Sequence, residues 1–164
     1  MSAIATTSPT TRTSLLRSIT LGGIFIGIVH LIVQEWLFFS LVEKNPFMSV
    51  LQYIASAALG NAAFAGGIAT ALIGVLFHLL TSFVIAAVFL LSADRISLLR
   101  RHAFVSAFLY AIGAFIVMNL IVLPLSAAPP LPAPTMFQFL ELIVEHLVVI
   151  GLPLWFLVRQ NETV

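Results

Sequence analysis

Five side chains in the apolar stretches of this sequence have chemistry that a membrane interior does not normally hold: His30, Gln34, His78, Glu141 and Glu145. Ionisable groups cost several kcal/mol inside a bilayer, so they usually face other protein rather than lipid. Imidazole and carboxylate groups at one depth can relay protons or bind a divalent cation, because His offers nitrogen ligands and Glu offers oxygen ligands. We predict these five as a candidate intramembrane polar site.

Three further residues are secondary candidates: His146, Asn119 and Glu35. His146 is rotated by ~100° from Glu145 on a helix, so we expect it to point away from the face that Glu141 and Glu145 share. Glu35 stands beside Trp36 near the end of an apolar run, and we interpret it as an interfacial residue that reaches the headgroups. For Asn119 we expect a role in capping a helix end before Pro124.

The pattern does not identify a ligand. The di-iron signature of helical bundles needs Glu-x-x-His on two helices, and the sequence has none. Two His on separate helices can ligate haem, but nothing else in the sequence indicates haem. We therefore predict no cofactor and leave the metal open, since neither a divalent cation nor haem has further support. The structural alternative is a His–Glu pair that neutralises itself and fixes helix register.

Composition indicates an integral membrane protein. The chain has 164 residues, of which 61% are hydrophobic and 8% charged, with a mean hydropathy of +1.16. Soluble domains carry about 25% charged residues. The absence of Cys excludes disulfides and thiolate catalysis. The sequence has no catalytic or nucleotide-binding motif and no basic stripe, so we predict neither an enzyme nor a nucleic-acid-binding protein.

The predicted fold is all-α, a single bundle of four transmembrane helices. The spans are expected at about 18–41, 67–91, 103–123 and 136–158, with a short interfacial or re-entrant helix at 46–59 between the first two. Pro124 should end the third span, and Pro153 should kink the fourth. We expect residues 1–17 to be a disordered tail and 159–164 to be a short polar tail.

The distribution of Lys and Arg predicts the orientation. Four spans put the N-terminal tail, the loop after the second span and the C-terminal tail on one side. That side holds Arg12, Arg17, Arg95, Arg100, Arg101 and Arg159, against Lys44 alone on the other. Positive residues favour the cytoplasmic side, so both termini are predicted in the cytoplasm.

Small residues form stripes that predict close helix packing. The first stripe, Gly23 and Gly27, leads to His30, and the second, Gly67, Ala71 and Gly74, leads to His78. The third span offers Ala103, Ala107 and Ala114 on one face. The Gly23/Gly27 spacing fits two helices of one chain or two chains, so a homo-oligomer or another membrane partner beside the lipid bilayer stays open.

Three segments resemble a group of small bacterial inner-membrane proteins without an assigned function, the YagU type. They are GVLFHLLTSFVIAAVF, MNLIVLPLSAAPP and EHLVVIGLPL, within residues 66–158. The strongest marks of this similarity are His78, the pair Met118-Asn119 and the pair Pro124-Leu125. The resemblance implies a four-span protein of the bacterial inner membrane, and it implies no activity.

Overall fold

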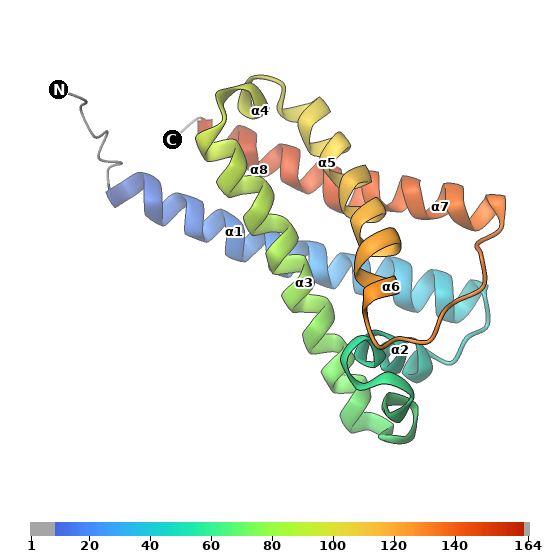
Figure 1. Cartoon of the computed structure of the whole chain (residues 1–164). Helices are drawn as coiled ribbons and strands as arrows, with labels where there is room; N and C mark the ends of the chain where they lie inside the picture. The colour runs from blue at the N-terminus through green and yellow to red at the C-terminus, as the bar shows by residue number, and fades with distance from the viewer. Residues whose placement is uncertain (1–8, 163–164) are drawn as a thin grey trace.

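The computed structural model describes residues 9–162, and every regular element in that range is a helix (Figure 1). Three helices contain π-helical segments, in which backbone bonds run from residue i to i+5 and widen the turn. In chain order the elements are α1 (Pro9–His30), η1 (Leu31–Val42), α2 (Phe47–Leu59), η2 (Gly60–Ala65), α3 (Gly67–Arg95), α4 (Ser97–Arg101), α5 (Ala103–Val117), η3 (Met118–Val122), α6 (Leu123–Leu125), α7 (Met136–His146), η4 (Leu147–Gly151) and α8 (Leu152–Glu162).

Five segments of the described chain are long and apolar enough to cross a membrane. They are Ser14–Val42, Phe47–Ala65, Gly67–Arg95, Ala103–Leu125 and Met136–Gln160. The all-helical class and the membrane character therefore agree with the expectation from composition. The second segment differs from the rest, because only its first 13 residues form an α-helix and a 3₁₀ turn makes up the remainder.

The long helices alternate in direction, and the two ends of the molecule are distinct. The start of α1, the end of α8 and the short helix α4 lie at one end, and α2 and the loop 126–135 lie at the other (Figure 1). Tyr53 of α2 donates a hydrogen bond to the carbonyl of Pro129 at 3.3 Å, and the amide of Ala127 donates to Ala57 at 3.0 Å. These bonds hold the proline-rich loop against α2.

Helix boundaries differ from the sequence expectation at the prolines. The first helix begins at Pro9, within the stretch predicted as a tail, because Pro suits a first helical turn; residues 1–8 lie outside the described range. The third long helix continues to Leu125 rather than ending at Pro124, which falls in the first turn of α6. Pro153 follows the π-helical turn η4. The wider turn already departs from the α-helical pattern of backbone hydrogen bonds that a proline would interrupt.

A hydrophobic core fills the half of the bundle that carries the termini. It joins α1, α3, α5 and α8 through large side chains such as Phe89 and Leu154 and through the fully buried Ala107 and Ala111 of α5. Ala103 belongs to this column, but Ala114 is only half-buried, and Ala111 takes its place on the buried face. Alanine side chains leave room for α8 to approach α5 closely.

The first glycine stripe packs within the chain, against α3. A Cβ built on Gly23 would lie 2.6 Å from the ring of Phe83, and one on Gly27 would lie 2.8 Å from Leu79. These distances are far below normal van der Waals contact, so only glycine permits this approach of α1 to α3. The stripe therefore has a partner helix in the same chain.

The second glycine stripe turns toward α2. A Cβ on Gly74 would overlap the carbonyl of Leu51, whose carbon would lie at 2.8 Å, and Ala71 is 4% exposed. Gly67 is the exception, since nothing lies within 4 Å of its position and its φ is +58°. Its inclusion in the packing stripe was wrong, because it stands at the start of α3, where the chain turns into the helix.

Candidate functional site

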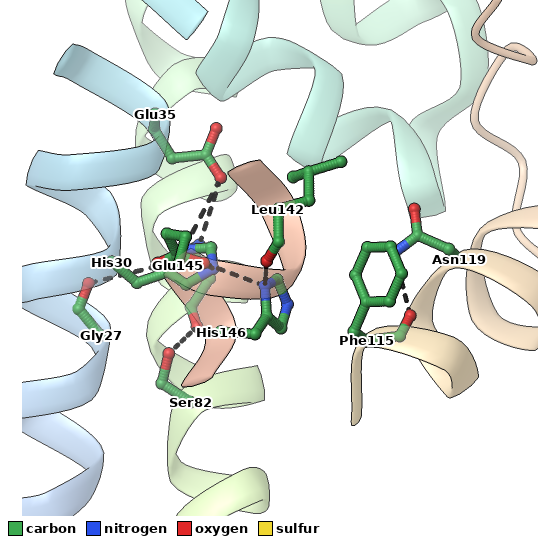
Figure 2. Close-up of polar contacts among 10 residues, drawn as sticks. Gly27, His30, Glu35, Ser82, Phe115, Asn119, Leu142, Glu145 and His146 are labelled. Atoms are coloured by element: carbon green, nitrogen blue, oxygen red, sulfur yellow. Dashed lines mark hydrogen bonds and ion pairs between the residues drawn. The ribbon is translucent and has the colours of Figure 1, made fainter. Parts of the chain in front are cut away.

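His30, the last residue of α1, lies at the centre of a cluster of imidazole and carboxyl groups (Figure 2). Its ring centroid is 5.0 Å from that of His78 on α3 and 5.4 Å from that of His146 on α7. Its Nε2 lies 3.4 Å from Oε2 of Glu145, and its Nδ1 lies 4.0 Å from Oε1 of Glu35. The imidazole of His30 therefore has a carboxyl group facing each ring nitrogen.

Glu35 lies inside the bundle, so its interpretation as an interfacial residue was wrong. It is 7% exposed, and its Oε1 lies 4.0 Å from Nδ1 of both His30 and His78. The physical reason is η1, which begins directly after His30. In a π-helix residues five apart come onto one face, which places Glu35 above His30, whereas an α-helix rotates this pair far apart.

His78 has its tautomer fixed by the backbone of α1. Its Nε2 lies 3.2 Å from the carbonyl oxygen of Gly27. A carbonyl oxygen only accepts, so Nε2 carries the proton and Nδ1 keeps a lone pair. That Nδ1 is the nitrogen that faces Glu35. The close approach of α1 and α3 at Gly27 thus positions a ring nitrogen as well as packing two helices.

Glu145 and His146 both reach the cluster from α7, although adjacent helical residues were expected to diverge. Both are buried, at 5% and 8% exposure, because α7 contacts His30 of α1 on one side and Phe115 of α5 on another. Glu145 faces His30, while His146 packs edge-on against Phe115 of α5, with centroids 5.2 Å apart. Nδ1 of His146 lies 2.9 Å from Oε2 of Glu145. The prediction that His146 points elsewhere was therefore wrong.

The carboxyl of Glu145 lacks a hydrogen bond in the described structure. Nδ1 of His146 lies near it but bonds the carbonyl of Leu142, at 2.8 Å, and both carboxyl oxygens of Glu145 remain without a donor. Buried polar groups in proteins are normally bonded, and an exception calls for a specific explanation, such as a catalytic role or a bound ion or water. The polar cluster is thus incomplete at Glu145.

A row of polar residues continues from the cluster toward the end of the molecule that carries α2. Gln34 is 1% exposed; its amide atoms form no hydrogen bond of good geometry but lie in looser contact with the carboxyl of Glu141. Glu141 lies within electrostatic reach of Glu145 and of Glu43. Glu43 accepts a short hydrogen bond from Gln138, which also closes the capping box at the start of α7. The opposite direction from the cluster holds the hydrophobic core.

Asn119 is the one candidate that the structure places apart. Its side chain is exposed and donates to the carbonyl of Phe115, four residues earlier on its own helix, at 2.9 Å (Figure 2). It therefore satisfies a backbone group at the transition from α5 to η3, rather than capping the helix end at Leu125.

Two overlapping triads have ligand atoms close enough to hold a metal ion. One consists of His30, Glu145 and His146, and the other of His30, Glu35 and His78; in each, the ligand atoms lie within 4.8 Å of one another. Glu35 and His146, both secondary candidates, complete these triads, whereas Gln34 and Glu141 stand beside them. Only the spacing of five between His30 and Glu35 could have indicated the second triad. This spacing places the two residues on one face only if the segment between them is a π-helix.

No protein-family model, curated protein or solved structure matches this chain. The functional interpretation therefore depends on the geometry of the cluster.

Proposed function

We propose that this protein crosses the bacterial inner membrane four times and uses its buried His/Glu cluster to bind or transfer a proton or a cation. The observation that carries the proposal is the carboxyl of Glu145, which is buried without a hydrogen bond 3.4 Å from His30. A buried carboxyl group is costly in a membrane interior even beside imidazoles, and ionisable groups at such positions commonly mark a pathway for protons or ions.

Four crossings are supported by the directions of the helices. The start of α1 and the end of α8 lie at the same end of the molecule, which requires an even number of crossings (Figure 1). The 13 residues of α2 extend ~20 Å, less than the ~30 Å hydrocarbon layer. We therefore take α2 with η2 as a short helix on the outer side. The arginine-rich end carrying α4 then lies in the cytoplasm.

The row of polar residues indicates from which side the cluster is reached. It runs from Glu145 past Glu141 to Glu43, which bonds Gln138 at the start of α7, at the end that this topology places outside. The core between the cluster and the cytoplasmic end is apolar. A proton or cation would thus approach from the outer side through this polar row.

A second candidate function is a membrane helper or packing subunit whose polar residues only set helix register. The bond between His78 and the carbonyl of Gly27 favours it, because this bond ties α3 to α1 at one register. This alternative requires no transport and predicts that loss of the cluster harms folding.

Flux measurements on purified protein in liposomes separate the two functions. With a proton-sensitive or metal-sensitive dye inside the vesicles, Glu145→Gln and His78→Ala should abolish flux while the yield of folded protein stays unchanged. Asn119→Ala is the matched control, since this side chain bonds only its own helix in the described structure. A collapse of folded yield in both variants, or full flux in both, would contradict the proposal.

A further inference from the structure

We propose that His30, His78 and Glu35 bind a divalent transition-metal ion through the two Nδ1 atoms and one carboxylate oxygen, with a fourth position left for an exchangeable ligand. The inference rests on the proposed cation site and selects one of its two triads. Imidazole nitrogen with carboxylate oxygen suits Zn²⁺ and its neighbours, whereas Mg²⁺ and Ca²⁺ prefer oxygen alone.

Hydrogen bonding decides between the triads. The backbone bond of His78 uses Nε2, so the Nδ1 that faces Glu35 keeps its lone pair. The backbone bond of His146 uses Nδ1, the atom that lies nearest Glu145, so this nitrogen carries a proton and cannot ligate. The triad of His30, Glu35 and His78 therefore has its ligand atoms free, whereas the triad with His146 has the Nδ1 of His146 occupied.

The surroundings of His30 resemble the support that metal-bound histidines receive. Such histidines usually donate their second ring N–H to a carboxylate or a backbone carbonyl, which fixes the ring and its tautomer. Nε2 of His30 faces Glu145 at 3.4 Å, and Nε2 of His78 bonds the carbonyl of Gly27. Nδ1 of His30 has no hydrogen-bond partner among the described residues, so it is available as a ligand. Both histidines thus point their remaining nitrogen toward Glu35.

Distance and charge are both compatible with a bound ion. Ligands of a tetrahedral Zn²⁺ lie roughly 3.4 Å apart, so each 4.0 Å separation between Glu35 and an imidazole must close by only ~0.6 Å. A divalent ion would also balance the carboxylates of Glu35 and Glu145, which are both buried. Unpaired charges are too costly to keep in a medium of low dielectric constant.

The test is Co²⁺ binding to the full chain in lipid nanodiscs after removal of bound metal by a chelator. We expect one Co²⁺ per chain with visible absorption of low-symmetry, four-coordinate type, displaced by Zn²⁺ but not by Mg²⁺ or Ca²⁺. Glu35→Gln and His78→Gln should abolish the absorption. Glu145→Gln, which removes support from His30, should weaken binding by about 10–100-fold. His146→Phe and Asn119→Ala should bind as the wild type does.

Several results would overturn the assignment. Loss of Co²⁺ binding in His146→Phe with retention in Glu35→Gln would assign the ion to the other triad, and absence of stoichiometric binding would exclude a metal centre. X-ray absorption of the Zn²⁺-loaded wild type must count two imidazoles, and any other count would exclude both triads even where a variant does not fold. Because each triad holds two histidines, the variants decide between the triads. Proton flux measured with chelator present separates the two proposals. If Glu145→Gln still abolishes that flux, the proposed function holds without the metal.

Discussion

Replacing Glu145 with leucine tests whether the cluster was selected for stability or for chemistry. The carboxyl of Glu145 is 5% exposed and its two oxygens lack hydrogen bonds in the described structure. Burying such a group costs about 1–3 kcal/mol. Polar contacts between membrane helices contribute about 0.6 kcal/mol on average, so the contacts of Glu145 with His30 and His146 offset only part of that cost. We expect Glu145→Leu to raise the free energy of unfolding by up to about 2 kcal/mol.

The alternative function, in which the polar residues only set helix register, predicts that Glu145→Leu lowers the free energy of unfolding. If Glu145 forms a buried ion pair that sets helix register, removing one partner should cost about 3–5 kcal/mol, because a charge is left uncompensated. The assay is equilibrium unfolding in mixed micelles with increasing SDS, with chelator present so that metal binding does not contribute. The two explanations predict changes of opposite sign in the free energy of unfolding, so the sign alone decides between them.

Gln52→Leu and Gln34→Leu calibrate the measurement. Gln52 is also buried, at 5% exposure, but it donates to the carbonyl of Gly67 at 3.0 Å, so its loss should destabilise the protein by about 1 kcal/mol. Gln34 is buried and has only a looser contact with Glu141, so its replacement should change the free energy of unfolding less than that of Gln52. A loss of more than about 1 kcal/mol in Glu145→Leu would refute the reasoning.

Three further predictions concern packing, access and topology. Gly74→Ala should destabilise the protein by about 1–3 kcal/mol, because the new Cβ would overlap the carbonyl of Leu51 on α2. Gly113→Ala is the control and should not destabilise it, because nothing lies within 4 Å of a Cβ at that position. SDS unfolding measures both variants. In this cysteine-free chain, a membrane-impermeant thiol reagent added outside should label Glu141→Cys but not Leu154→Cys, and equal labelling would contradict one-sided access. A reporter fused after Arg159 should report the cytoplasm and one in the proline-rich loop the outside; a reversed pattern would overturn the orientation.

Hydropathy and charge were enough to predict the long helices, because each apolar run must be a helix if it is to bury its backbone polar groups in lipid. The ends of the helices were not predictable in the same way. Pro9 lies in the first turn of its helix, where its missing N–H matters least, and Pro124 lies in the last turn of a long helix, directly after the π-helical η3. A proline in the sequence can therefore stand near the start or near the end of a helix, and the residue alone does not tell which.

The candidate site was predictable to the extent that it depends on depth along a helix. His30, His78 and Glu145 come from three different helices and meet in one cluster, as their assignment to one intramembrane site predicted. Direction around the helix was less predictable, because the rotation of ~100° per residue assumes a regular α-helix. Glu35 follows a π-helical start and turns inward, and His146 reaches the cluster because α7 is enclosed on two sides.

Packing and chemistry are not separate features of this bundle. Gly27 was expected only to let helices approach, yet its carbonyl oxygen also bonds Nε2 of His78 and so determines which nitrogen of that ring faces Glu35. A side chain at position 27 would meet Leu79 and Ser82 of α3 and force the two helices apart. The bond to His78 would then lengthen, and the ring would lose its fixed tautomer. The small-residue stripe before His30 is therefore part of what positions the cluster.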